Sequence, residues 1–314
     1  MGLAQRLPAL PDGFRVVEGE RGVMACREGH LDSLLASGFS PDGRHRVGGA
    51  PEMVDARESG REPLGLLKIG GVPCLARRFS HGGLARALTG RRFKDPSRPF
   101  DELVLSESLL ERSVPTPRVV AARAVRARPM GFELTLVTER IPGSMDLGHL
   151  LGAVRRGERC EGDLRRAILA AGRLVRRVHD AGCVHADLQP ANVLLLEGRW
   201  EEAWILDLDR SSLHDGGALP EAARTRNLGR LWRHVVRRER EYGPVVGVRG
   251  ALRFLRAYGV PQADRRRFMV AVEENSGDRG LLHRLGWWLE RTFGRSLDPR
   301  AAADAPQLPR TPRG

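Results

Sequence analysis

The segment from Val184 to Arg210 restricts the structure and chemistry of this chain more than any other part of its sequence. It begins with His185-Ala186-Asp187, places Asn192 five residues after Asp187, and continues into an apolar run that ends at Asp207. Polar residues in loops most often cap turns. Composition alone would produce the pattern His-x-Asp-x-x-x-x-Asn in only about one in a hundred chains of this length. The spacing therefore indicates a functional site.

The side chains of this segment suit phosphoryl transfer, in which catalysis consists mainly of positioning and charge neutralisation. We expect Asp187, on a loop, to orient the attacking hydroxyl and accept its proton. Asn192 offers a neutral oxygen and Asp207 an anionic oxygen for a magnesium ion beside the nucleotide phosphates. His185 belongs to the same catalytic motif, and we expect it to form structural hydrogen bonds rather than to carry a proton.

The chain changes from strand-rich to helix-rich near residue 140. Residues 64–69 and 72–79 flank Gly70-Gly71, which predicts a β-hairpin, and residues 119–122 and 132–138 predict further strands. A helix is predicted between 100 and 112. Beyond Gly143, the apolar spacing predicts helices over residues 164–179, 225–240, 248–258, 265–274 and 281–293.

The two ends of the chain carry weaker patterns. The first 45 residues mix proline, glycine and charge without a clear period, and we expect an N-terminal extension there. Residues 298–314 are rich in proline and arginine and predict a disordered tail. No signal-peptide pattern opens the sequence, and no apolar run approaches the roughly 18–20 residues that span a bilayer. A cytoplasmic location is therefore expected.

The cysteines and the charge leave only broad expectations. The cysteines are widely spaced without a Cys-x-x-Cys pair, which predicts reduced buried thiols instead of disulfides or a zinc site; they are Cys26, Cys74, Cys160 and Cys183. The net charge of +13 favours polyanionic partners, yet only Lys68 and Lys94 are lysines, and a GC-rich genome explains such an arginine excess equally well. DNA binding rests on charge alone, and no specific nucleic-acid partner is expected.

Several further motifs occur in a fixed order around the central segment. They are Ala76-Arg77-Arg78-Phe79-Ser80-His81-Gly82-Gly83-Leu84, Val114-Pro115-Thr116-Pro117-Arg118, Thr138-Glu139-Arg140-Ile141-Pro142-Gly143, Leu206-Asp207-Leu208-Asp209-Arg210 and Arg226-Asn227-Leu228-Gly229-Arg230-Leu231. Together with the His-x-Asp pattern, this set resembles the lipopolysaccharide core kinases of Gram-negative bacteria, the Kdo kinase and WaaP family of the protein-kinase-like superfamily. The resemblance covers roughly residues 58–240.

The resemblance implies an α+β, protein-kinase-like fold with two lobes and ATP in the cleft between them. The small β-rich N-lobe would span residues 46–140, and the helical C-lobe residues 141–297. Glu139 would lie in the hinge, where its backbone would meet the adenine. Glu102 matches the helix glutamate of the family. The usual strand lysine is absent, and Arg77 is its simplest replacement, with Arg78 and Lys68 as alternatives.

The nucleotide phosphates also need a backbone that approaches them closely. The polar turn around Gly60 is such a candidate, although it lacks a repeated glycine motif. Asp209 is a candidate second carboxylate for the metal or substrate region. These assignments complete the expected cofactor set of ATP and Mg²⁺.

Two departures from protein kinases indicate a small acceptor. Ala186 replaces the arginine that anchors a phosphorylated activation loop, and only residues 211–223 separate the Asp207 strand from the next helix. We expect phosphorylation of a sugar hydroxyl, in Kdo of the lipopolysaccharide inner core, with a lipid A and Kdo glycolipid as partner. Other readings stay open, namely an aminoglycoside-phosphotransferase-like kinase and a nucleotide-binding pseudokinase.

Arginines around the predicted helix at 225–240 extend this expectation. They either bind the phosphates and carboxylates of the acceptor or hold the protein against the anionic cytoplasmic face of the inner membrane. The arginines are Arg224, Arg226, Arg230, Arg233, Arg237, Arg238 and Arg240.

Overall fold

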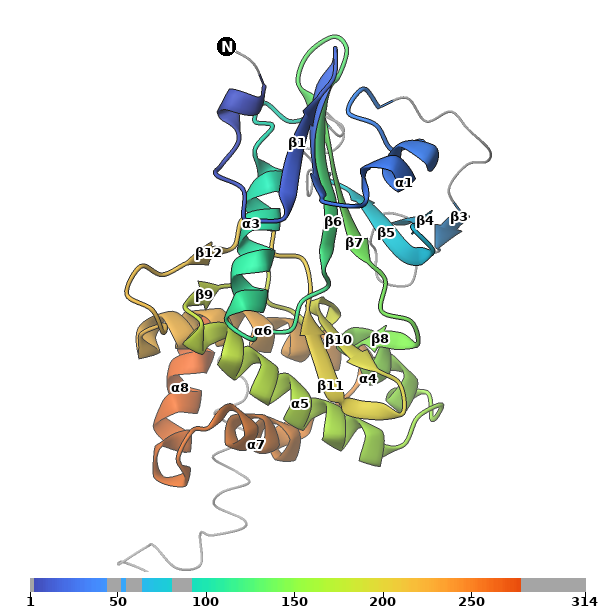
Figure 1. The fold of residues 1–314 in the computed structure, drawn as a ribbon. Helices are drawn as coiled ribbons and strands as arrows, with labels where there is room; N and C mark the ends of the chain where they lie inside the picture. Colours follow the sequence, from blue (N-terminus) through green and yellow to red (C-terminus); the bar gives the residue numbers. More distant parts are fainter. Residues whose placement is uncertain (1–2, 44–51, 55–63, 81–91, 278–314) are drawn as a thin grey trace, which may run out of the picture.

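A seven-stranded antiparallel sheet organises the first half of the chain in the computed structural model, which describes residues 3–43, 52–54, 64–80 and 92–277 (Figure 1). The strand order is β1-β2-β6-β7-β5-β4-β3. The bounds are β1 Phe14–Glu18, β2 Gly22–Arg27, β3 Glu52–Val54, β4 Leu64–Ile69, β5 Val72–Arg78, β6 Val119–Arg126 and β7 Phe132–Glu139.

Helices cover both faces of this sheet. Helix α3 (Arg98–Glu111) packs on β6 and β7, and its Phe100 and Leu103 are fully buried there. The opposite face is buried beneath α1 (Leu31–Ala36) and the residue Phe39 that follows it. The sheet therefore has an apolar core on each side, and α3 holds the side that carries the site described below.

The expected N-terminal extension over residues 1–45 needs correction, because part of it belongs to the sheet. Strand β1 pairs with β2, and β2 pairs with β6 through partners such as Met24 and Arg123. Five of the six residues of β2 are buried. The short apolar run from Val23 to Cys26 fills the space on both faces of the sheet, so this segment is part of the fold itself.

The hairpin of β4 and β5 confirms the prediction made for residues 64–79. Gly70 and Gly71 form its turn with φ angles of 57° and 87°. A two-residue turn with both φ angles positive matches the twist of the paired strands, and glycine adopts it without a steric penalty. The helix expected over residues 100–112 and the strands near 119 and 132 are also present.

Helices dominate the second half of the chain, as its apolar spacing predicts. The helices are α4 Leu147–Arg155, α5 Glu161–Asp180, α6 Glu221–Tyr242, α7 Gly247–Tyr258 and α8 Arg265–Ser276. Short strands also occur, at β8 Ser144–Asp146, β9 Cys183–Val184, β10 Val193–Leu196, β11 Arg199–Ile205 and β12 Ser212–Leu213. Three 3-10 turns complete the described chain, η1 Ala4–Arg6, η3 Pro190–Asn192 and η4 Gln262–Asp264. The expected helix at 281–293 and the expected tail lie outside the described residues.

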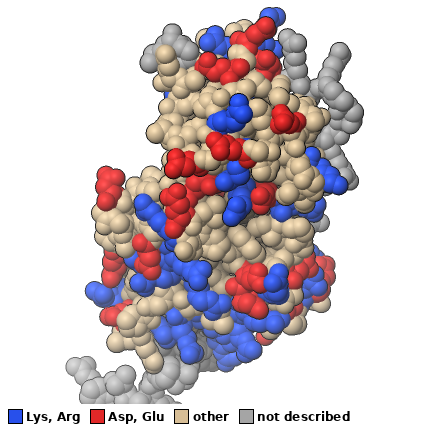
Figure 2. Space-filling model, in the orientation of Figure 1, with Lys and Arg blue, Asp and Glu red and all other residues tan. Residues whose placement is uncertain are grey.

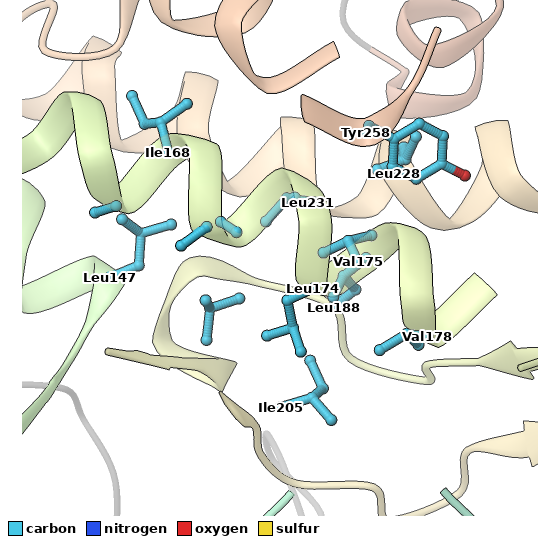
Figure 3. Packing of buried hydrophobic residues seen from close by; sticks show 14 of the residues in the cluster. Leu147, Ile168, Leu174, Val175, Val178, Leu188, Ile205, Leu228, Leu231 and Tyr258 are labelled. Atoms are coloured by element: carbon cyan, nitrogen blue, oxygen red, sulfur yellow. The ribbon is translucent and has the colours of Figure 1, made fainter. Parts of the chain in front are cut away.

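Helix α5 forms the centre of the helical lobe. Its apolar stripe includes Leu174, Val175 and Val178 and belongs to one buried cluster with residues of α4, α6 and α7 (Figure 3). Leu188 and Ile205, which flank the polar residues of the central motif, are buried in the same cluster. The core therefore fixes the two backbone segments that carry Asp187 and Asp207.

The expectation of buried, reduced thiols is wrong for one of the four cysteines. All four cysteines are free, and three of them are buried while Cys160 is exposed. Burial raises the pKa of the Cys74 thiol to about 11 and that of Cys183 to about 12, which keeps both protonated. In the described part of the chain, no helix has the length and apolar character needed to cross a membrane.

Candidate active site

A β-hairpin brings together the two residues expected to hold a metal ion. Strands β10 and β11 pair Val193 with Ile205, and the N–H of Leu206 donates to the carbonyl of Asn192 at 2.9 Å. Asn192 precedes β10 and Asp207 follows β11, so the two side chains start from the same end of the hairpin. The hairpin thus brings Asn192 and Asp207 close together, although they are fifteen residues apart in the sequence.

Asp187 lies on the loop that leads into this hairpin. The side-chain amide of Asn192 donates to the backbone carbonyl of Asp187 at 2.7 Å, and Gln189 Nε2 donates to the Asp187 carboxylate at 2.5 Å. These bonds orient the carboxylate relative to Asn192. The amide oxygen of Asn192 is consequently directed away from the Asp187 carbonyl, as a cation ligand requires.

His185 holds the loop through both of its ring nitrogens. Nδ1 accepts the N–H of Asp187 at 3.1 Å, and Nε2 donates to the carbonyl of Leu206 at 2.9 Å. Burial lowers the pKa of His185, so the ring is neutral with its proton on Nε2. The residue links the Asp187 loop to the Asp207 strand, which agrees with a structural role.

Residues of helix α6 form hydrogen bonds with the backbone of the same loop. Asn227 donates through Nδ2 to the carbonyl of His185 at 2.6 Å and accepts the His185 N–H at 3.3 Å. Arg230 donates to the carbonyl of Ala186, and His179 Nε2 donates to Asn227 Oδ1 at 3.0 Å. Asn227 was expected only as part of a motif, and Arg230 was expected to bind an acceptor or a membrane; in the structure both residues bind the Asp187 loop.

Arg77, on β5, is the basic residue that meets the helix glutamate. It forms an ion pair with Glu102, and its Nη1 lies 3.1 Å from Asp207 Oδ1. Successive side chains of a strand point to opposite faces, so Arg78 is directed away from α3. Of the three candidates Arg77, Arg78 and Lys68, the structure brings Arg77 to this position.

Glu102 is buried and joins three parts of the site. Besides Arg77, it accepts the backbone N–H of Leu208 at 3.2 Å. Its pKa is raised to about 7, first because burial removes water from the carboxylate and then because Asp207 and Asp209 lie near it, while Arg77 opposes the shift. Glu102 therefore connects the strand-rich lobe to the segment that carries Asp207.

Asp209 pairs with Arg98, one helical turn before Glu102 on α3. Arg98 Nε donates to Asp209 Oδ1 at 3.1 Å, and a second bond joins Arg98 Nη2 to Oδ2. Asp209, the candidate second carboxylate for the metal or substrate region, thus forms a bidentate ion pair with Arg98. Asp207, which lies close in sequence to this pair, has a φ of 59°, a left-handed conformation that is uncommon for residues other than glycine and often found at active sites.

The two remaining candidates lie farther from this centre. Glu139 ends β7 at the connection between the lobes, and its N–H donates to the carbonyl of Arg118 at 2.9 Å. Because that N–H is already bonded within the protein, an adenine ring bound at this connection would need hydrogen bonds from other backbone groups. Gly60 lies outside the described residues.

Comparisons with known proteins match this region. The family model "Lipopolysaccharide kinase (Kdo/WaaP) family" matches residues 77–271. A 3-deoxy-D-manno-octulosonic acid kinase of Xanthomonas campestris pv. campestris (strain B100) is 31% identical over 229 residues, which cover 71% of this chain and 84% of that protein. The kinase of the same name from Haemophilus influenzae (strain 86-028NP) is 30% identical over 169 residues, 52% of this chain.

The chain spans 66% of the length of that Haemophilus influenzae protein. Among solved structures, "WaaP in complex with acyl carrier protein" is similar at 22% identity and a TM-score of 0.49, covering 72% of this chain and 88% of that chain. The family match includes Arg77, Glu102, Asp187, Asn192 and Asp207.

Proposed function

Because the chain belongs to the lipopolysaccharide kinase (Kdo/WaaP) family, we propose that it transfers the γ-phosphoryl group of ATP to a hydroxyl of Kdo in the lipopolysaccharide inner core. The observation that carries the proposal is the convergence of Asp187, Asn192 and Asp207 beside the pair of Arg77 and Glu102. Each of these side chains has a distinct task in phosphoryl transfer.

The donor set fits a magnesium ion. Asn192 and Asp207 offer one amide and one carboxylate oxygen, and Mg²⁺ prefers such oxygen ligands together with water and substrate phosphates. Among the described residues, no group of three or more His, Cys, Asp or Glu side chains forms a metal site. A site with few protein ligands agrees with an ion that binds together with the nucleotide, where it would neutralise phosphate charge.

The residues of the chain then divide the work. Asp187, oriented by Gln189 and by the Asn192 amide, accepts the proton of the acceptor hydroxyl. Arg77 directs its guanidinium toward the nucleotide phosphates, and Glu102 keeps that guanidinium in place. His185 maintains the distance between the Asp187 loop and the Asp207 strand.

We propose that the reaction takes place at the cytoplasmic face of the inner membrane, where the protein associates peripherally with an anionic surface. Arginine side chains are frequent on the face of the helical lobe shown in Figure 2, where acidic and uncharged residues lie between them. Basic side chains near an anionic membrane each contribute about 1 kcal/mol of attraction. The net charge of +13 supports this location.

The test is transfer of the labelled γ-phosphate of ATP to Kdo–lipid A in the presence of magnesium. We expect incorporation by the wild-type protein, and a decrease of at least about a thousandfold in Asp187→Asn and Asp207→Asn, because each change removes a charge that acts at the reacting phosphoryl group. Asp12→Asn, an exposed site away from these contacts, is the matched control. ATP binding without transfer by the wild type would contradict the proposal and favour a pseudokinase.

A further inference from the structure

A cavity of about 580 Å³ lies between α4, α6 and the loop that carries Asp187. Gln189, Pro190 and Ala191 of that loop line one end of it. Gln189 also donates to the Asp187 carboxylate at 2.5 Å, so the cavity begins one side chain away from the proposed base. A molecule that fills the cavity would extend to the point where a hydroxyl must meet Asp187.

Five of the seven arginines of α6 fall into two groups according to their contacts. Arg224, Arg230 and Arg233 are engaged within the fold, where they bind Asp180 and the carbonyls of Ala186 and Ser276 respectively. Arg237 and Arg238 line the cavity and are exposed. In the described part of the chain, no carboxylate oxygen lies within 4.0 Å of a guanidinium nitrogen of Arg237 or Arg238, so neither forms an ion pair.

Arg238 lies against helix α4. A Cβ atom at Gly148 would lie 3.3 Å from Arg238 Nη1, and a Cβ at Gly152 would lie 3.6 Å from Arg238 Nη2. The Arg238 guanidinium is therefore placed beside the turn of α4 that carries these two glycines, and Asp146 Oδ1 lies 3.0 Å from the same Gly148 Cβ position.

Two of the carboxylates that line the cavity have structural partners. Asp146 caps α4 by accepting the His149 N–H at 3.0 Å, and it also bonds to the His149 ring. Glu239 accepts three successive backbone N–H groups, from Val245 to Gly247, at 2.7–3.0 Å. These bonds orient both carboxylates without removing their charge. Glu241 also lines the cavity, which is bordered by three carboxylates and four arginines in all, among them Arg237 and Arg238.

Arg155 adds a third guanidinium at the outer edge. It lies 4.6 Å from the centroid of the Tyr242 ring, which fixes its orientation without cancelling its charge. The cavity is therefore lined both by Arg155, Arg237 and Arg238 and by residues 189–191 of the catalytic loop. Guanidinium groups recognise carboxylates through paired hydrogen bonds.

We propose that this cavity is the acceptor subsite, and that Arg237 and Arg238 determine specificity by binding the carboxylates of an acidic sugar while its hydroxyl meets Asp187. The inference rests on the proposed kinase function and adds the residues that select the acceptor. It assigns these arginines to the sugar acid and not to the membrane surface.

The experiment combines binding with kinetics for the full-length protein. Binding of Kdo–lipid A in neutral detergent micelles is measured for the wild type, Arg237→Gln, Arg238→Gln and Arg238→Lys. The same variants are assayed for phosphate transfer. Arg253→Gln, an exposed arginine on α7, is the matched control. Two further probes are the same glycolipid with its carboxylates methyl-esterified, and micelles that contain phosphatidylglycerol.

We expect each glutamine variant to weaken binding of the glycolipid, and to raise its KM, by about tenfold, because each loses a charge-assisted contact. The KM for ATP should stay unchanged, Arg238→Lys should recover part of the loss, and the esterified lipid should bind all variants alike. Equal binding of the acidic lipid by all variants would overturn the inference, as would failure of the wild type to bind it. A parallel loss of binding to phosphatidylglycerol micelles would also overturn it, since it would indicate a membrane contact.

The two proposals fail in different ways. Arginine-dependent binding without any transfer would leave the subsite in place and refute the kinase reaction. Phosphate transfer that is the same in the wild type and in the Arg237 and Arg238 variants would support the kinase reaction and refute the subsite.

Discussion

Replacing Glu102 by glutamine should remove a large part of the pH dependence of stability on the alkaline side of pH 5. The carboxyl group of Glu102 has a pKa of about 7 in the folded protein, against an ordinary value of 4.5. Between these values the folded protein holds a proton that the unfolded chain has released. The free energy of unfolding therefore decreases as pH rises from 4.5 through 7, and stability that is present at acid pH is lost.

The magnitude follows from the two pKa values. Each pH unit between them changes the free energy of unfolding by about 1.4 kcal/mol, which gives a loss of about 2–3 kcal/mol between pH 5 and pH 8. Glutamine keeps the shape of the side chain and has no proton to release. The difference in stability between wild type and Glu102→Gln should shift by this amount in favour of the variant.

Urea unfolding at pH 5, 6, 7 and 8 measures the effect, and the difference between the two proteins cancels the contribution of all other titrating groups. Glu111→Gln changes an exposed glutamate at the end of the same helix and serves as the control. A wild-type-minus-variant difference that stays constant from pH 5 to pH 8 would show that Glu102 is ionised throughout, and the reasoning from burial would then be wrong.

Three other perturbations have defined outcomes. Arg98→Gln, Asp209→Asn and the double variant should reduce kcat by similar factors, with a coupling of about 1–3 kcal/mol in the cycle, because the pair acts as a unit; additive losses would contradict this. Burial lowers the pKa of His179 from 6.5 to about 4, so the wild type should lose about 3 kcal/mol of stability as pH falls through this interval, and His179→Gln should not, as urea unfolding would show. Gly172→Val should lower the melting temperature by an amount equivalent to about 3 kcal/mol in calorimetry, since a Cβ there would lie 2.7 Å from the Phe254 carbonyl oxygen; an unchanged melting temperature would show that α5 and α7 separate easily.

Local patterns were sufficient for the elements whose partners are near in sequence. The β4–β5 hairpin depends on two glycines between apolar runs, and α5 depends on a regular apolar stripe. Strands β1 and β2 were not predicted, because β2 pairs with β6, about a hundred residues later in the sequence. A short apolar run such as Val23 to Cys26 shows no periodicity from which that pairing can be inferred.

The site was predictable only where a motif fixes residues a short distance apart. Asp187, Asn192 and Asp207 belong to one loop and one hairpin, so spacing alone brought them together. The choice of Arg77 over Arg78 needed the position of α3 relative to the sheet. The ion pair of Arg98 with Asp209 joins residues more than a hundred positions apart, and no local sequence pattern predicts it.

The support of the Asp187 loop by α6 ties the central motif to the core of the helical lobe. Asn227 and Arg230 donate to the carbonyls of His185 and Ala186. Leu228 and Leu231, on the same helix, are buried in the core cluster that also contains Leu188. A substitution in that core that displaces α6 would therefore move the Asp187 loop without altering any residue of the motif itself.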